Sequence, residues 1–362
     1  DLATIPRVGL ADLERQVKLI PTEVGELLGG GVLLSHPLPT AGVLYANVLL
    51  DLMHLPIGDL PLIRLYSEML TEVGTSSLDP VALQRRIGAR TGGISTSMIY
   101  EQPVGEDGVV ADPLEAICKL GISGKATADK AADLFELMHS ILSDANLDAQ
   151  PKAIELLRES KNYLETSMVS AGSSYAGMRL AARDTLLGYI GEVTQGVTYY
   201  QSVLELLSLA RDDWPELLGR LRRLRGSLLG KGGLIINLTT DQHHLDDLRP
   251  LIDRFVSDFP DEPPIVSAAP SWREAVQLLP RGDEAFTITS QVNYVAASAP
   301  LFLPGEHADG SLFTVSKHLS NGFLWDNVRV VGGAYGGGCS FNVNSGSMVF
   351  SSYRDPNLQS TL

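Results

Sequence analysis

The octapeptide GAYGGGCS, residues 333–340, matches GARTGGIS, residues 88–95, at a constant offset of 245 residues. Both contain the pattern G-A-x-x-G-G-x-S, and each stands between a helix-like segment and a strand-like segment. The order of strands, helix, glycine turn and strand around them also agrees, as expected for tandem copies of one kind of domain. We therefore predict an α+β fold of tandem domains, each with an antiparallel or mixed sheet packed with helices, and a glycine turn that is architectural in both.

The predicted first unit, residues 22–260, follows a lead-in over residues 1–21. Strands are expected within residues 29–55 and around 94–100 and 116–124, with a buried strand in GGLIINLTT, residues 232–240. Asp79 and Pro80 have the residue types of a helix N-cap and first helical position, so a helix should begin there. Further helical patterns cover residues 60–74, most of 126–229, and 244–259.

A linker is predicted over residues 261–274, where prolines accompany small and acidic residues, and a second unit over 275–362. EAFTITSQVNYV, residues 284–295, alternates apolar and polar side chains and predicts a half-buried strand. A helix from about Ser311 should bury one stripe, and NVNSGSMVF, residues 342–350, predicts a hairpin. The stripe consists of Leu312, Val315, Leu319 and Phe323.

The offset of 245 also predicts that the chain is a fragment of a longer protein. Residue 362 corresponds to residue 117, where the first unit has just begun its central sheet. By this correspondence the second unit, the start of a domain, would lack its later helices and closing strand.

The chain has 43 acidic and 28 basic residues, a formal charge of −15. This charge disfavours nucleic acid and anionic membranes as partners and favours cationic ones, although solubility alone would explain it. No apolar run approaches the roughly 18 residues of a membrane span, and the first 21 residues have neither secretory nor transit-peptide character. Cys118 and Cys339 are too few for a disulfide framework, and their apolar surroundings predict inert thiols.

Several catalytic motifs are absent from the sequence. Neither H-E-x-x-H nor H-x-x-E-H occurs, so the chain itself should hold no catalytic zinc, and the pair His243-His244 at a helix start is interpreted as structural. A G-x-S-x-G elbow and a phosphate-binding P-loop are also missing. The glycines near residue 335 run from a helix into a strand, the reverse of a phosphate loop.

Arg329 and Tyr335 remain as candidates for chemistry on either side of the glycine turn. An arginine and a tyrosine can bind a carbonyl or carboxylate, or stabilise an oxyanion, without a metal. The simpler alternative is a surface ion pair for Arg329 and a half-buried Tyr335; Trp325 nearby is expected in the core. At the offset of 245 the first unit has Gln84 and Arg90 instead, which favours the functional interpretation.

The segments QVNYV (291–295), SKHLSNGFLWDNVRVVGGAYGGGCSF (316–341) and SSYRDPNL (351–358) resemble the carboxy-terminal half of the presequence proteases. These are organellar members of the pitrilysin-type M16 zinc metallopeptidases, and the resemblance, to a plant or algal member, covers the whole chain. It implies four homologous α+β domains around a closed chamber, of which this chain would supply the third and the start of the fourth.

The resemblance further implies peptide hydrolysis by a zinc-bound water, with the H-x-x-E-H motif in the first domain. Tyr335 would then donate to the oxyanion and Arg329 would hold the substrate backbone. Gln291 and Asn293 would bind substrate from a sheet edge. The chain alone, without the zinc motif, is expected to bind no zinc and to be inactive.

The implied partners are the amino-terminal catalytic half of the same polypeptide and basic, unstructured targeting peptides, with no nucleic acid or membrane. The implied location is the chloroplast stroma, the mitochondrial matrix, or both. A non-catalytic M16-like scaffold or peptide-binding module is the alternative. An H-x-x-E-H motif upstream of residue 1 would favour the enzyme over the scaffold.

Overall fold

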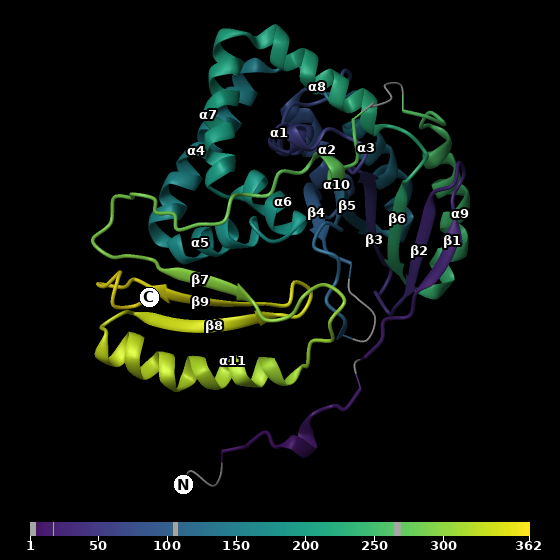
Figure 1. The fold of residues 1–362 in the computed structure, drawn as a ribbon. Coiled ribbons are helices and arrows are strands. Elements are labelled where there is room, and N and C mark those ends of the chain that lie inside the picture. Colours follow the sequence, from purple (N-terminus) through teal and green to yellow (C-terminus); the bar gives the residue numbers. More distant parts are fainter. Residues whose placement is uncertain (1–4, 17, 104–107, 264–268) are drawn as a thin grey trace.

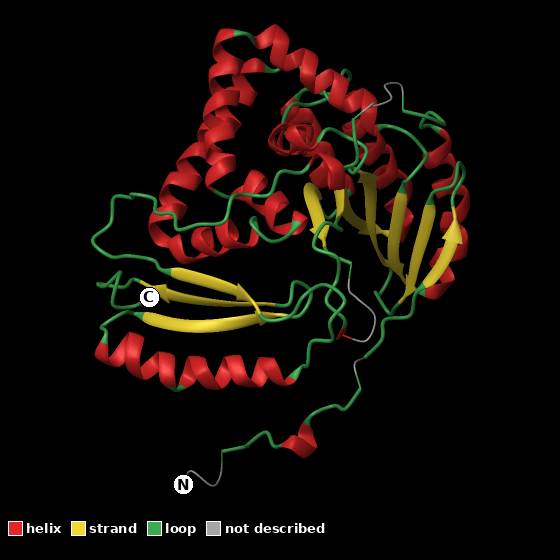
Figure 2. Cartoon of the chain, viewed as in Figure 1, coloured by secondary structure: helices red, strands yellow, loops and turns green. Residues whose placement is uncertain are grey.

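The structure, a computed structural model, describes residues 5–16, 18–103, 108–263 and 269–362 (Figure 1). These residues form a six-stranded sheet of order β1-β2-β6-β3-β5-β4 and a three-stranded sheet of order β7-β9-β8. Figure 2 shows most of the helices beside the larger sheet and one long helix beside the smaller sheet. The α+β class predicted from the sequence is confirmed.

The six-stranded sheet is mixed. β6 runs parallel to β2 on one side and antiparallel to β3 on the other, so the segment predicted as a buried strand lies inside the sheet. Its strands are β1 (Glu23–Glu26), β2 (Val32–Pro37), β3 (Val43–Asp51), β4 (Ile94–Glu101), β5 (Ile117–Thr127) and β6 (Ile235–Thr240).

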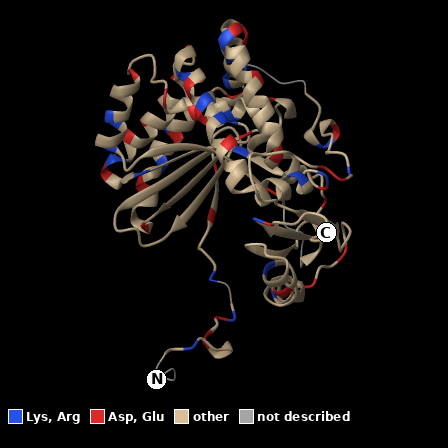
Figure 3. Ribbon diagram, turned by 90° about the vertical axis from the view of Figure 1, so that its left-hand side faces the viewer, with Lys and Arg blue, Asp and Glu red and all other residues tan. Residues whose placement is uncertain are grey.

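Helices gather on one side of this sheet (Figure 3). Alternate residues of β3 from Leu44 to Leu50 are almost completely buried, whereas Tyr45 between them is 44% exposed. The helices are α1 (Leu60–Leu70), α2 (Pro80–Arg90), α3 (Ala131–Asp144), α4 (Gln150–Ser170), α5 (Gly172–Ala181), α6 (Leu186–Gln195), α7 (Val197–Asp212), α8 (Trp214–Leu228) and α9 (Gln242–Ser257).

The predicted start of α2 is confirmed, because the Asp79 carboxylate accepts a hydrogen bond from the Ala82 N–H at 2.8 Å. Short 3₁₀ turns occupy η2 (Leu10–Asp12), η3 (Ile57–Asp59) and η5 (Ala128–Lys130). Among the described residues, none of the helices combines the length and apolar character that crossing a membrane requires.

The second sheet repeats part of the first. Along the chain β7 (Ala296–Pro300) is followed by α11 (Ser311–Asn321), a π-helix η6 (Trp325–Val331), β8 (Gly336–Asn342) and β9 (Ser347–Tyr353). The order β7-β9-β8 corresponds to β3-β5-β4. In each set the strand that comes first along the chain pairs with the strand that comes last, and two helical segments precede the strand that lies between them in the sequence. The internal repeat is therefore a repeat of topology.

The offset of 245 does not continue beyond the glycine turn. A connection of residues 102–116 joins β4 to β5, whereas residues 343–346 suffice between β8 and β9, so β9 is already the counterpart of β5. The argument that the second unit ends as its sheet begins was therefore wrong. What the described second sheet lacks is counterparts of β1, β2 and β6.

The glycine turn is also less similar in the two units than predicted. Gly88 lies within α2, while its sequence equivalent Gly333 has a φ of 79° and ends the helical segment. The first chain reversal instead uses Gly92 and Gly93 just before β4. The two helical segments end at different points of the pattern, and the shared glycines consequently take different roles.

The strand predicted over residues 284–295 was wrong. This segment runs irregularly past α5, and β7 begins at Ala296, after a single bridge between Asn293 and Asp355. Side-chain contacts take the place of a strand ladder here. The guanidinium of Arg179 donates two hydrogen bonds of 2.8 Å to the Glu284 carboxylate, and Arg183 donates a third at 3.0 Å.

The predicted apolar stripe of α11 was also wrong in part, since Val315 is 44% and Phe323 65% exposed. α11 approaches β8 through small side chains: the Ser320 hydroxyl accepts from the Cys339 N–H at 2.9 Å, and Ser316 is buried. The helical periodicity of apolar residues could not predict that α11 packs on β8 through the face that carries Ser316 and Ser320.

Part of the predicted linker packs into the first core. In α10 (Trp272–Ala275), Trp272 is 1% exposed, and its indole N–H donates to the Leu55 carbonyl at 2.6 Å. Residues 264–268 of that predicted linker lie outside the described residues. The domain boundaries at 21, 260 and 274 remain predictions.

The two units also meet through the β4–β5 connection. The Val110 N–H donates to the Glu306 carbonyl at 2.8 Å, and the Ala308 N–H donates to the Gly108 carbonyl at 2.9 Å. Val110 is buried in a small cluster with Phe341 and Met348 of the second sheet. In Figure 1 that sheet lies between α5 and α11.

A bare backbone lets the π-helix lie against β8. A Cβ atom added to Gly337 would stand 2.8 Å from Cγ1 of Val328, which is closer than carbon atoms pack. A Cβ atom added to the neighbouring Gly336 would meet nothing within 4 Å. Of these two glycines, Gly337 is the one that the packing requires.

We predict that Gly337→Ala destabilises the second unit by about 1–3 kcal/mol, since the added methyl group overpacks the contact with Val328. Gly336→Ala is the matched control and should change the free energy of unfolding by less than about 0.5 kcal/mol. Urea denaturation of the two variants gives the comparison. Equal stability of the two variants would contradict the described packing.

Glu284→Gln should lower the free energy of unfolding by about 1–3 kcal/mol, because Arg179 and Arg183 lose a charged hydrogen-bond acceptor. The hydrogen bonds from Arg179 lower the pKa of Glu284, so this stabilisation exists above about pH 4.5 and is lost as the pH falls through the lowered folded-state pKa. Asp283→Asn, the same charge change at the exposed neighbouring residue, is the control. Denaturation midpoints against pH should converge for wild type and Glu284→Gln at low pH; a constant difference would contradict the ion-pair explanation.

Candidate functional site

The segment carrying Arg329 is a π-helix rather than the ordinary helix that the sequence indicates. The Gly332 N–H donates to the Asn327 carbonyl, five residues back, at 2.9 Å. π-Helical turns are rare and are found frequently at functional sites. The wide turn, Trp325–Val331, leads directly into the glycines before β8.

Arg329 lies between two aromatic rings. Its guanidinium carbon is 4.1 Å from the ring centroid of Trp325 and 5.6 Å from that of Tyr335. Within the described residues no carboxylate forms an ion pair with it, so the alternative of a surface ion pair is not what the structure contains. The N–H groups of Arg329 are available to a ligand.

Tyr335 is 64% exposed rather than half buried. Its backbone N–H donates to the Arg354 carbonyl at 3.2 Å, and its ring meets that of Tyr353 edge to face, with centroids 5.9 Å apart. The phenol hydroxyl forms no hydrogen bond within the described part of the chain. The structure thus brings Arg329 and Tyr335 together, with an unengaged donor on each side chain.

Trp325 corrects an expectation. Predicted to lie in the core, it is 43% exposed, and its ring packs against Arg329. None of the residues of this π-helix is buried, Val330 and Val331 included, so the helix offers no core position for Trp325. Arg329, Trp325 and Tyr335 form the Arg329 cluster.

Within the described residues, the side chains of Gln291 and Asn293 make no hydrogen bond or ring contact with the Arg329 cluster. The Asn293 side-chain amide donates to the Asp355 carbonyl at 3.2 Å and to the Asn357 carbonyl at 3.4 Å, so it holds the last turn of the chain. Gln291 is exposed. Their substrate-binding role, like those of Arg329 and Tyr335, remains a prediction.

Sequence reasoning missed the residues that support the cluster from the last turn. Arg354 has a φ of 49°, unusual for a non-glycine residue, and its guanidinium lies 5.5 Å from the Tyr353 ring. The Asn357 side chain donates to the Gly332 carbonyl at 2.6 Å, and the buried Asp355 accepts from the Thr361 hydroxyl at 2.8 Å. No periodicity in the sequence marks such contacts, and in the segment SSYRDPNL only the family resemblance indicates their importance.

The two cysteines have the environments predicted for inert thiols. Cys118 is completely buried, and burial raises the pKa of its thiol to about 12. The Cys339 thiol donates to the Ser316 carbonyl at 3.3 Å, next to α11. Neither environment is that of an activated nucleophile.

A metal site cannot be assembled from the residues that the structure describes. No group of three or more His, Cys, Asp or Glu side chains there is arranged to hold an ion. The His243 and His244 rings lie 3.9 Å apart without a third ligand. That this chain binds no zinc remains a prediction.

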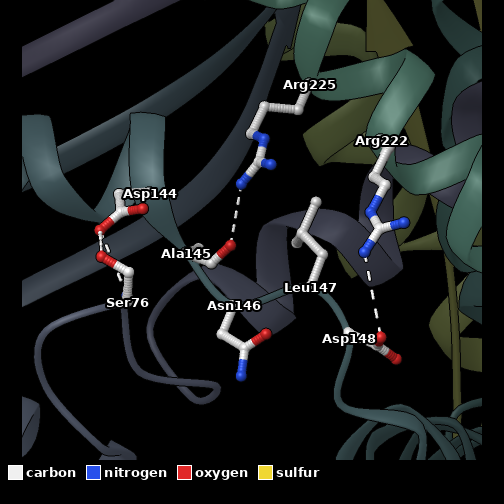
Figure 4. Close-up of a pocket in the computed structure, with 8 residues that line it drawn as sticks. All are labelled: Ser76, Asp144, Ala145, Asn146, Leu147, Asp148, Arg222 and Arg225. Carbon is white, nitrogen blue, oxygen red and sulfur yellow. Dashed lines mark hydrogen bonds and ion pairs between the residues drawn. The ribbon is translucent and has the colours of Figure 1, made fainter.

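A small pocket of about 200 Å³ lies between α8, the loop that follows α3 and the segment between α1 and α2 (Figure 4). Its charged side chains are engaged: Arg225 donates to the Ala145 carbonyl at 2.8 Å, Arg222 pairs with Asp148, and Asp144 accepts from the Ser76 hydroxyl. The lining residues are Ser76, Asp144, Ala145, Asn146, Leu147, Asp148, Arg222 and Arg225. The charged side chains of this pocket already have partners, and the Arg329 cluster is the better candidate.

Two family models match the chain. Residues 1–206 match the model of the associated region of M16 peptidases of subfamily C, and residues 283–362 match the PreP C-terminal domain. The first match covers more than half of the chain.

Curated relatives align over nearly the whole chain. Presequence protease 1, chloroplastic/mitochondrial, of Arabidopsis thaliana is 34% identical over 361 residues, covering 100% of this chain and 32% of that protein. Protein HypA of Clostridium perfringens is 27% identical, covering 100% of this chain and 36% of that protein. The mitochondrial presequence protease of Saccharomyces cerevisiae is also 27% identical, covering 98% and 35%. The chain spans about a third of the length of these relatives.

Solved structures share the fold. A peptidase M16 inactive domain from Pseudomonas fluorescens has a TM-score of 0.55 at 13% identity, covering 94% of this chain and 76% of that one. A conserved protein from Enterococcus faecalis V583 has a TM-score of 0.57 at 15% identity, covering 91% and 75%. At these identities the likeness concerns the fold alone. With the two family models, the curated relatives and the repeated α+β topology in agreement, the chain belongs to subfamily C of the M16 peptidase family.

Proposed function

We propose that this chain is the carboxy-terminal, non-zinc-binding half of a metalloendopeptidase that degrades cleaved targeting peptides and other short unstructured peptides. The observation that carries the proposal is the pairing of Arg329 and Tyr335 on an exposed surface, 5.6 Å from guanidinium carbon to ring centroid, with donors unengaged by the described chain. Two relatives named presequence proteases are about three times as long as this chain. Their length supports an amino-terminal half of the same polypeptide as the partner of this chain.

The two side chains suit complementary tasks. The phenol of Tyr335 can donate a hydrogen bond to an oxygen that becomes negative as a carbonyl is attacked. The planar guanidinium of Arg329 can hold a peptide carbonyl or carboxylate through two parallel N–H groups. A zinc ion held by the proposed amino-terminal half would supply the activated water.

The charge and the relatives support the substrate class and the location. A net charge of −15 attracts basic peptides at long range, and Figure 3 shows residues of both signs on the helices. The net negative charge therefore supports the diffusional encounter with a basic peptide and does not identify a specific contact with it. We place the protein in the chloroplast stroma, the mitochondrial matrix, or both, because the relatives are named as chloroplastic or mitochondrial.

In a polypeptide that also contains the amino-terminal half, Tyr335→Phe should lower kcat by about one to three decades, because one oxyanion donor is lost. KM should change little. The control is Tyr163→Phe, which removes the same hydroxyl from a tyrosine that is 70% exposed on α4. An unchanged kcat in Tyr335→Phe, measured on an unstructured peptide, would remove Tyr335 from the mechanism.

The chain by itself should neither cleave peptides nor bind zinc stoichiometrically. The physical reason is that the described donor set lacks the ligands for a metal-activated water. Metal analysis and a peptidase assay with and without a chelator give the measurement. Chelator-sensitive cleavage by the isolated chain would contradict the division of the site between two halves, and cleavage absent even when both halves are joined would favour the scaffold.

A further inference from the structure

Trp325 is the closest aromatic neighbour of the Arg329 guanidinium among the described residues. The centroid of its ring lies 4.1 Å from the guanidinium carbon, against 5.6 Å for Tyr335. The favourable range for a cation over an aromatic face extends to about 6 Å, and tryptophan has the strongest attraction of the aromatic residues. The two residues are four positions apart in the π-helix, so one helical turn presents both on the same side.

Core packing does not explain the position of Trp325. The side chain is 43% exposed, and two later residues of the same π-helix, Val330 and Val331, are 64% and 82% exposed. The described ring contact of Trp325 is the one to Arg329. The guanidinium of Arg329 is therefore the specific partner that the structure describes for the Trp325 ring.

The stack leaves the chemistry of Arg329 intact. A ring over the guanidinium occupies its face, whereas hydrogen bonds to a carbonyl or carboxylate leave from its edge, where the five N–H groups lie in the plane. A free arginine side chain, which has many rotamers, loses conformational entropy when it is fixed. An arginine side chain that an aromatic ring already holds loses less conformational entropy when it binds a peptide.

We propose that Trp325 is a positioning residue, which fixes the guanidinium of Arg329 so that its edge meets the peptide backbone. The proposal rests on the proposed function of Arg329 and adds a residue to it. Trp325 acts on substrate binding through Arg329 and touches no reacting atom.

The test compares variants at residue 325 in the polypeptide containing both halves. Trp325→Leu keeps an apolar side chain of good helix propensity but removes the aromatic face, and should raise KM about two- to fivefold with kcat nearly unchanged. Trp325→Phe keeps an aromatic face and should recover at least half of that loss. Phe323→Leu, the same kind of change at an exposed neighbour without a described contact to Arg329, is the control and should leave KM unchanged.

A double-mutant cycle with Arg329→Ala separates positioning from direct contact. If Trp325 acts through Arg329, Trp325→Leu should raise KM no further once Arg329 is alanine. Equal effects in both backgrounds would overturn the proposal, as would equal KM values for Trp325→Leu and Trp325→Phe. If Arg329→Ala itself leaves KM and kcat unchanged, the proposed function of Arg329 fails; an Arg329→Ala effect without a Trp325→Leu effect overturns the positioning role alone.

Discussion

The close approach of Val328 to the backbone of β8 is the contact on which the candidate site depends. Because Gly337 has no side chain, the π-helix lies against the strand at a distance that a methyl group would prevent. Arg329 follows Val328 directly, and Tyr335 precedes β8 directly, so this one contact sets the spacing of the two side chains. The glycines therefore determine the geometry of the cluster without taking part in its chemistry.

The cluster is anchored on a sheet that does not stand alone. The β4–β5 connection of the first unit supplies Val110 to the second core, and the segment before β7 is tied to α5 by Arg179 and Glu284. Tyr294 adds a third tie, since its hydroxyl donates to the Val169 carbonyl at 2.7 Å. A three-stranded sheet with one helix buries little apolar surface, and these contacts hold it against the larger unit.

The sequence allowed most of the first unit to be predicted, because its long periodic segments bury complete stripes, as β3 does from Leu44 to Leu50. It failed over residues 284–295, where alternation was real but arginine–carboxylate pairs replaced strand pairing. It also failed for Trp325, because hydrophobicity does not distinguish a core residue from a ring stacked on a cation. Arg329 and Tyr335 were found from residue type beside a conspicuous turn, a signal that Asn357 and Arg354 do not give.

The corresponding positions of the first unit show why the second is the functional candidate. There the Gln84 side chain donates to the Thr71 carbonyl at 2.8 Å, and Arg90 lies 3.6 Å from the Asp133 carboxylate. Both side chains thus hold their own unit together. Arg329 and Tyr335 have no such partner in the described chain and are held by aromatic faces, which constrain a side chain without using its hydrogen-bonding groups. Residues that correspond in sequence at the offset of 245 therefore serve differently in the two units: those of the first stabilise its fold, and those of the second present donors.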